Sequence, residues 1–127
     1  PELGYQLNMT PRDISRHGIA DCDAWCKKNR DGKTFAQLTT EQQTEVLRLL
    51  ESGKVELENT PPKLLFGYLL SNAKEGFLAD PIYGGNKAMV GWKLIGFPGA
   101  RADFMDWIDM PNKPYPYGPV SINGESA

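Results

Sequence analysis

The chain has little of the chemistry that metal-dependent enzymes use. Its 127 residues include one histidine, His17, and two cysteines, Cys22 and Cys26. A single histidine nearly excludes haem held by two histidines, and most zinc and non-haem iron sites. The two cysteines do not by themselves settle the redox compartment. No apolar stretch reaches about 18 residues, so the sequence predicts no transmembrane helix.

The chain also lacks a net positive charge. The formal net charge is −2, and without a basic field a nucleic acid is disfavoured as a partner. The chain begins at Pro1 and carries no signal pattern, so we expect a processed or trimmed chain whose targeting segment has been removed. No alternating strand pattern and no internal repeat is present, and the length is that of one domain.

Helix-start signals occur three times in the first eighty residues. Thr10-Pro11 combines an N-cap threonine with proline in the first turn, and Thr60-Pro61-Pro62 repeats this signal. Thr39 with Gln42 forms a capping box. These helices are expected to end at Asn29-Arg30-Asp31-Gly32, Gly53 and Asp80-Pro81. Three helices with short connections predict a mostly α fold, a small antiparallel helical bundle.

The elements expected after Asp80 are shorter, and the chain ends in a proline-rich segment. In order we expect a turn at Gly84-Gly85, a helix over 87–95 capped by Asn86, a loop over 96–99 and a helix over 102–109. The sequence then reads PNKPYPYGPVSINGESA, which predicts an extended, polyproline-like tail. We therefore assign residues 1–110 to a helical domain and residues 111–127 to a tail that is either disordered or laid along a partner.

Residues 77–117 contain eight of the thirteen aromatic side chains. The short helices expected here can bury only part of this apolar surface, and aromatic and methionine side chains are typical of protein–protein interfaces. The alternative is that Trp92, Phe97 and Trp107 close the open end of the bundle. We favour an interface, with Trp92 and Phe97 as its anchors. Its expected residues are Tyr83, Gly84, Gly85, Asn86, Trp92, Lys93, Phe97, Pro98 and Trp107.

The glycines of this segment allow two interpretations. Gly84-Gly85-Asn86 ahead of a helix is a potential anion site, although no strand precedes it and the G-x-G-x-x-G spacing is absent. We favour the second interpretation, in which the glycines make tight turns and close backbone contacts.

The string ADPIYGGNKAMVGWKLIGFPGA, residues 79–100, is long and unusual. Together with the upstream strings FAQLTTEQQTEVLRLLESG and KEGFLADP, it closely resembles the hallmark of the gluconate 2-dehydrogenase subunit 3 family. The resemblance covers residues 11–110. It implies the non-catalytic small subunit of a bacterial membrane-associated dehydrogenase for sugars, sugar alcohols or sugar acids, with no catalytic residue, cofactor or metal of its own.

The resemblance also implies the partners. They are a large FAD-bearing subunit of the glucose-methanol-choline type and a multihaem cytochrome subunit with c-type haem. A small subunit of this kind supports maturation and stability of the flavoprotein, and its twin-arginine signal exports both chains. The implied location is the periplasm, attached to the inner membrane through the complex.

Two other functions would use the same residues differently. A dissociable export or folding chaperone would share the interface but release its client. A small metal- or ligand-binding protein would use the Gly-Gly-Asn turn or Asp103, Asp106 and Asp109. We expect these three aspartates to form the solvated face of a short helix, and we expect His17 to be solvated or to cap a helix.

Cys22 and Cys26 lie four residues apart on one face of the first expected helix. A disulfide within a helix is awkward at this spacing, and together with His17 the two thiols do not converge well on a metal. Two alternatives stay open. Both cysteines are buried small apolar side chains, or one forms a disulfide with a partner chain, which the implied periplasmic setting would permit.

Overall fold

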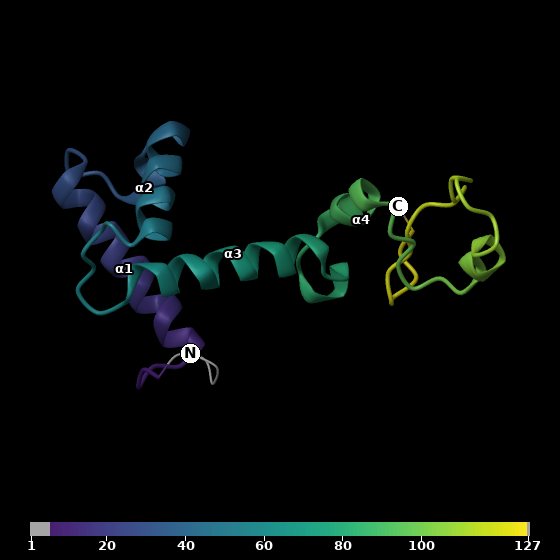
Figure 1. The fold of residues 1–127 in the computed structure, drawn as a ribbon, viewed down its shortest axis with the longest axis horizontal. Coiled ribbons are helices and arrows are strands. Elements are labelled where there is room, and N and C mark those ends of the chain that lie inside the picture. Colours follow the sequence, from purple (N-terminus) through teal and green to yellow (C-terminus); the bar gives the residue numbers. More distant parts are fainter. Residues whose placement is uncertain (1–5, 127) are drawn as a thin grey trace. The chain divides into compact units, whose positions relative to one another are not determined.

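The computed structural model describes residues 6–126, apart from the side chain of Phe104, and it is mostly helical, as the sequence predicts (Figure 1). The α-helices are α1 (Pro11–Asn29), α2 (Thr40–Ser52), α3 (Pro62–Leu78) and α4 (Val90–Ile95). The 3-10 helices are η1 (Phe35–Gln37), η2 (Pro81–Tyr83), η3 (Lys87–Met89) and η4 (Asp103–Trp107). No strand forms within residues 6–126, and none of their helices is long and apolar enough to cross a membrane.

The chain divides into two compact units, one up to Ser71 and one from Asn72 onward. We call them unit 1 and unit 2. The division falls inside α3, so this helix contributes its first part to unit 1 and its end to unit 2. The sequence-based division at residue 110 stays a prediction.

The helices of unit 1 start where the sequence predicts. The Thr10 hydroxyl accepts from the Asp13 N–H, and the Asp13 carboxylate accepts from the Thr10 N–H, which makes a complete capping box for α1. Thr39 and Gln42 form the same arrangement for α2. The left-handed φ of Gly53, 73°, ends α2.

The core of unit 1 is assembled around one buried position per turn of α1. On α1 the positions Ile14, Gly18, Cys22 and Cys26 recur every fourth residue and are buried. Buried side chains of α2, α3 and the connections complete the core, namely Leu38, Val46, Leu50, Val55 and Leu65. Gly18 leaves room for the Leu65 side chain, which a Cβ at this position would meet.

A buried carboxylate ties the loop before α3 to α1. Asp21 accepts hydrogen bonds from the backbone N–H groups of Asn59 (2.9 Å) and Thr60 (3.0 Å), and from the Asn59 side-chain amide (3.0 Å). Burial alone would raise the pKa of Asp21, but these hydrogen bonds outweigh it and lower the pKa below its ordinary value.

Unit 2 differs from the sequence-based prediction over residues 87–95, where one helix was expected. Ala88 (φ 53°) and Met89 (φ 54°) adopt left-handed conformations, and these split the segment into η3 and the short helix α4. The helix predicted over 102–109 is also shorter, because only Asp103–Trp107 forms a 3-10 turn.

The proline-rich C-terminal segment contains no helix within its described part, and it returns to earlier parts of unit 2. Val120 forms an isolated parallel bridge with Gly99 and an antiparallel bridge with Ser126. The N–H of Ala100 donates to the carbonyl of Val120 (2.7 Å), and the N–H of Ile122 donates to the Asp80 carboxylate (2.8 Å). The segment is therefore folded onto its own chain, at least around residues 118–126.

Candidate functional site

Three glycines of unit 2 allow backbone segments to approach each other closely. A Cβ at Gly85, Gly91 or Gly99 would collide with a carbonyl oxygen, that of Gly76, Phe77 or Val120 respectively. Carbonyl groups of the backbone cannot move aside as a flexible side chain can, so these positions require glycine. For these three glycines the prediction of close backbone contacts is thus confirmed, whereas Gly84 and Gly96 adopt positive φ without such a contact.

Asn86 connects the end of α3 with the start of α4. Its N–H donates to the carbonyl of Gly76 (2.7 Å), and its side-chain amide donates to the carbonyl of Ala79 (3.0 Å). Its side-chain oxygen accepts from the N–H of Gly91 (2.7 Å) in the first turn of α4. Contrary to the prediction, the Asn86 side chain does not cap the helix that begins at Lys87; it instead accepts from the first turn of α4, whose N-cap residue is Met89.

Trp92 is held inside unit 2 by a hydrogen bond and by packing against another ring. The ring nitrogen donates to the carbonyl of Leu78 (2.7 Å), and the side chain is only 5% exposed. Phe97 packs edge-on against the ring at a centroid distance of 5.2 Å and is itself 46% exposed. Most of the Trp92 surface is therefore used within the chain, whereas Phe97 offers surface to a partner.

The predicted interface residues fall into three groups in the structure, according to their burial. Asn86 and Trp92 are buried and shape unit 2, while Gly85, Pro98 and Trp107 are half-buried. The exposed members are Tyr83, Gly84, Lys93 and Phe97. Their role in binding a partner stays a prediction.

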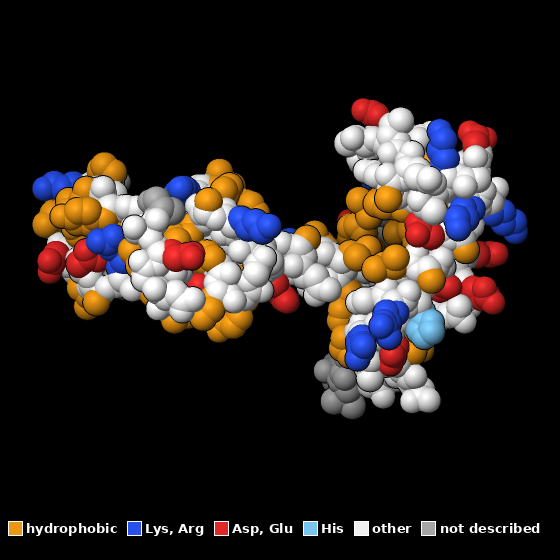
Figure 2. Space-filling model, turned by 180° about the vertical axis from the view of Figure 1, so that it is seen from behind, with side chains coloured by type: hydrophobic (Ala, Val, Ile, Leu, Met, Phe, Trp, Pro, Cys, Tyr) orange, Lys and Arg blue, Asp and Glu red, His pale blue; other side chains and the backbone are white. Residues whose placement is uncertain are grey.

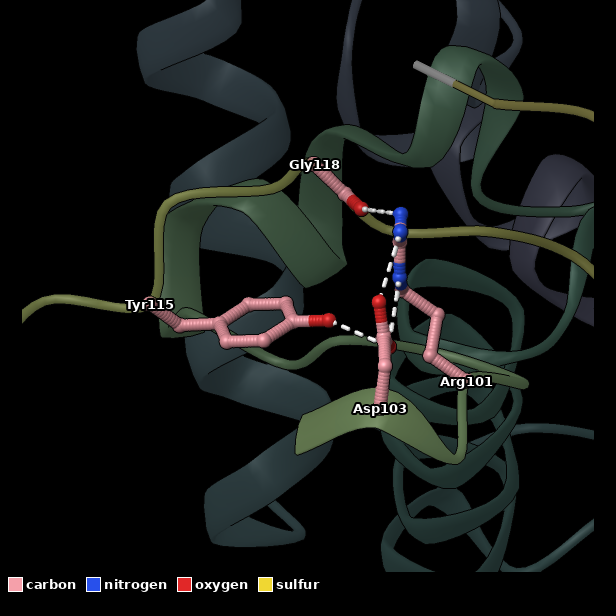
Figure 3. A network of polar contacts seen from close by, with 4 residues as sticks. All are labelled: Arg101, Asp103, Tyr115 and Gly118. Atoms are coloured by element: carbon pink, nitrogen blue, oxygen red, sulfur yellow. Dashed lines mark hydrogen bonds and ion pairs between the residues drawn. The ribbon is translucent and has the colours of Figure 1, made fainter. Parts of the chain in front are cut away.

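Arg101 is the centre of a polar network that holds the proline-rich segment (Figure 3). Its guanidinium donates two hydrogen bonds to the Asp103 carboxylate, both 3.0 Å long, and one to the carbonyl of Gly118 (3.2 Å). The Tyr115 hydroxyl donates to the same carboxylate (2.6 Å). The hydrogen bonds from Arg101 and Tyr115 lower the pKa of Asp103 to about 2.

Aromatic rings continue this network along the segment. The Arg101 guanidinium lies 4.9 Å from the centroid of the Tyr117 ring, and Tyr115 contacts both Tyr117 and Trp107 edge-on. A groove of about 370 Å³ lies beside these rings. Its lining includes Lys93, Phe97, Pro98, Pro114, Tyr115 and Tyr117.

Large apolar side chains are exposed over most of unit 2. Of the sixteen large hydrophobic residues that are exposed within residues 6–126, thirteen follow Ser71. They include Tyr83 (77% exposed), Leu94 (75%) and Ile95 (59%). Figure 2 shows hydrophobic side chains at the surface of the part of the chain that contains α4 and the C-terminal segment, at the left. The sequence predicted this region from its aromatic residues, but the expected interface left out the most exposed aliphatic side chains, which are Leu94, Ile108 and Ile122.

Unit 1 carries a smaller apolar feature. A pocket of about 220 Å³ opens between its helices, and its lining includes Ile19, Cys22, Asp23, Phe35, Leu47 and Leu69. Asp23, which lines this pocket, already accepts a hydrogen bond within the chain, from the N–H of Phe35 (2.9 Å).

The residues considered for metal or acid–base chemistry are not brought together. Within residues 6–126, no three or more histidine, cysteine, aspartate or glutamate side chains are grouped to hold a metal ion. Asp103 pairs with Arg101, whereas Asp106, Asp109 and His17 are exposed.

Cys22 and Cys26 are free thiols buried in the core of unit 1. Burial, with a smaller contribution from Cys26, raises the pKa of the Cys22 thiol to about 12. Their burial agrees with the alternative in which both act as small apolar side chains. A disulfide between one of them and a partner chain stays a prediction.

Comparison with known proteins identifies the family. Residues 5–99 match the family described as gluconate 2-dehydrogenase subunit 3. The chain belongs to this family. No curated protein and no solved structure matches the chain. The matched residues contain all four α-helices. They end at Gly99, where a close backbone contact leaves no room for a side chain.

Proposed function

We propose that this chain is the non-catalytic small subunit of a periplasmic, membrane-associated, FAD-dependent dehydrogenase of the gluconate, sugar or polyol type. In this role it supports the maturation, stability and export of the flavoprotein subunit. The observation that carries the proposal is the exposed apolar surface of unit 2, in a chain that belongs to the gluconate 2-dehydrogenase subunit 3 family.

The exposed surface supports a permanent contact with a larger protein. A soluble monomer rarely leaves many large apolar side chains together in water, because such patches promote aggregation unless a partner covers them. Tyr83, Leu94 and Phe97 are exposed side chains of this surface that a partner can bury. We expect the interface to bury more than about 1,200 Å² in total, the lower bound for a stable complex.

The polar groups of unit 2 support a structural role. Asp80 and Asn86 are buried, and their side chains form hydrogen bonds with backbone groups of the same chain. Asp103 is bound by Arg101 and Tyr115. Polar groups that are bound within the chain stabilise the shape of the surface. A general acid or base would instead have to face a substrate.

The Gly84-Gly85-Asn86 turn is also used structurally. The N–H of Asn86 donates to the carbonyl of Gly76, so it does not point at an external anion. In the proposed complex we assign FAD to a large subunit of the glucose-methanol-choline type. The c-type haem belongs to a cytochrome subunit that passes electrons onward at the inner membrane. Export would follow the twin-arginine route.

Co-expression of the full chain with the FAD-bearing large subunit tests the proposal. We expect the two chains to co-purify through a tag on the large subunit and to remain together at about 1 M salt, where charges are screened within about 3 Å. We also expect the FAD content of the large subunit to fall when this chain is left out. A large subunit that is fully loaded and active without this chain, and that never retains it, would contradict the proposal. A chain that is needed for loading but is then released would show a dissociable chaperone instead.

A further inference from the structure

The surface around α4 combines exposed apolar side chains with charge of a single sign. Between Pro81 and Ala102 the sequence contains Lys87, Lys93 and Arg101 and no acidic residue. Arg101 is paired with Asp103. Lys87 and Lys93 are exposed and form no ion pair with any residue in the described range 6–126. Two unpaired cations therefore accompany Tyr83 and Leu94, the most exposed large apolar side chains within residues 6–126.

The same surface is built from consecutive short elements. The 3-10 turn η2 contacts η3, and η3 contacts α4. Val90 and Leu94 are one helical turn apart on α4 and are 54% and 75% exposed, so they share a face of this helix. Lys93 is adjacent in sequence to Leu94. We call residues 82–97 the α4 surface.

We propose that the α4 surface docks onto an apolar area of the flavoprotein subunit that is bordered by aspartate and glutamate side chains. This inference rests on the proposed function and adds the chemistry of the partner. Apolar contacts from Leu94, Ile95 and Phe97 would set the lifetime of the complex, because burial of such groups dominates interface energies. Lys87 and Lys93 at the border would guide the encounter, because rim charges act mainly on the association rate.

Two other occupants fit the surface less well. A second copy of this chain in a two-fold arrangement would bring lysines of the same surface toward each other, with no acidic residue between 81 and 102 to compensate them. An anionic membrane is usually bound by clusters of about four to eight basic residues, and the α4 surface offers two unpaired ones.

Charge reversal on the full chain tests the inference. The association rate with the purified FAD-bearing subunit is measured for the wild-type chain and for the double variant Lys87→Glu/Lys93→Glu. At about 0.05 M salt we expect the variant to associate about tenfold more slowly, and we expect the difference to shrink as salt rises to about 0.3 M. The milder variant Lys87→Gln/Lys93→Gln should give a smaller effect in the same direction, and it serves if the first variant fails to fold.

A matched control separates a local effect from a change in overall charge. Lys28→Glu/Lys33→Glu alters the net charge equally at exposed positions of unit 1, and it should leave the association rate nearly unchanged. Equal slowing by both double variants, or slowing by neither, would overturn the inference while the wild-type complex still upholds the proposed function. Failure of the wild-type chains to bind each other would overturn both.

Two further measurements identify the other occupants. Binding of the wild-type chain to phosphatidylglycerol vesicles, lost in Lys87→Glu/Lys93→Glu while flavoprotein binding is unaffected, would assign the surface to a membrane and contradict the inference. Dimers of the wild-type chain that the same substitutions abolish, again with unaffected flavoprotein binding, would assign it to a second copy.

Discussion

Unit 1 and unit 2 place their apolar side chains in opposite ways. Ten hydrophobic residues are buried within residues 6–126, and eight of them lie in unit 1. The two in unit 2 are Met89 and Trp92. Of the sixteen large hydrophobic residues that are exposed in the same range, thirteen lie in unit 2. Unit 1 is therefore stabilised by an apolar core, and unit 2 keeps most of its apolar surface outside.

Unit 2 holds its shape by other means. Glycine contacts, the Asn86 and Asp80 hydrogen bonds, the Trp92 indole and the Arg101 network replace a large core. A region with few buried apolar contacts opens more readily than one with many. We expect unit 2 to be the less stable of the two and to gain stability when its surface is covered by the partner subunit.

A matched pair of leucine substitutions gives the largest expected contrast between the units. Leu50 is fully buried in unit 1, and Leu50→Ala should lower the free energy of unfolding by about 2–5 kcal/mol. Leu94 is 75% exposed in unit 2, and Leu94→Ala should change it by less than about 0.5 kcal/mol. Urea unfolding followed by circular dichroism measures both. Leu94→Ala should instead weaken binding to the flavoprotein subunit, and similar losses of stability in the two variants would remove the contrast.

A pair of glycine substitutions tests how unit 2 is held together. A Cβ in Gly91→Ala meets the carbonyl of Phe77, and the resulting displacement of α4 should cost about 1–3 kcal/mol. A Cβ in Gly18→Ala meets the flexible end of Leu65, and the better helix propensity of alanine, about 1 kcal/mol, offsets part of that clash. Urea unfolding followed by circular dichroism measures the loss in both variants, and fluorescence of Trp92, with Trp25 and Trp107 replaced by phenylalanine, reports on unit 2. A larger loss from Gly18→Ala would contradict this account.

Asp80 tests the attachment of the C-terminal segment. Asp80→Asn leaves one side-chain oxygen for two backbone donors, the N–H groups of Ile82 and Ile122. We expect a loss of about 1–3 kcal/mol and faster amide hydrogen exchange at Ile122. Asp106→Asn, at an exposed position of the same unit, should leave exchange at Ile122 unchanged. Unchanged protection in Asp80→Asn would show that the segment is held by its other contacts.

The pH dependence of the Arg101 network gives the smallest expected effect, because Asp103 is exposed. The pKa of Asp103 is lowered from its ordinary value near 3.8 to about 2. A lowered folded-state pKa stabilises the fold above about pH 3.8, and this contribution is lost as the pH falls through about 2. Carboxyl NMR shifts should give a midpoint near 2 for Asp103, and Arg101→Gln should move it upward. A midpoint near 3.8 in the unmodified chain would show that the network does not form in solution.

The sequence predicted those features that depend on neighbouring residues. The N-cap of Thr10 and the capping box of Thr39 with Gln42 each depend on residues within three positions of one another, so both can be predicted from the local sequence. Gly53 likewise ends α2 because a left-handed residue is needed at that point. The start of α3 near Pro62 was predicted as well.

Features that depend on distant residues could not be predicted. Asp21 binds Asn59 and Thr60 almost forty positions away, and Asp80 binds Ile122. No pattern in the neighbouring sequence predicts such pairs. The left-handed conformations of Ala88 and Met89 were also missed, because neither residue type favours positive φ. The aromatic content of residues 77–117 indicated an exposed surface, but it did not show that Trp92 is buried by packing within unit 2.

The claim that unit 2 provides the docking surface is tested most directly by side-chain footprinting of the full chain, free and in complex with the FAD-bearing subunit. We expect labelling of Tyr83, Leu94 and Phe97 to fall on complex formation, while the exposed positions of α1 and α2 remain labelled. Protection of α1 or α2 with unchanged labelling at residues 82–97 would contradict it.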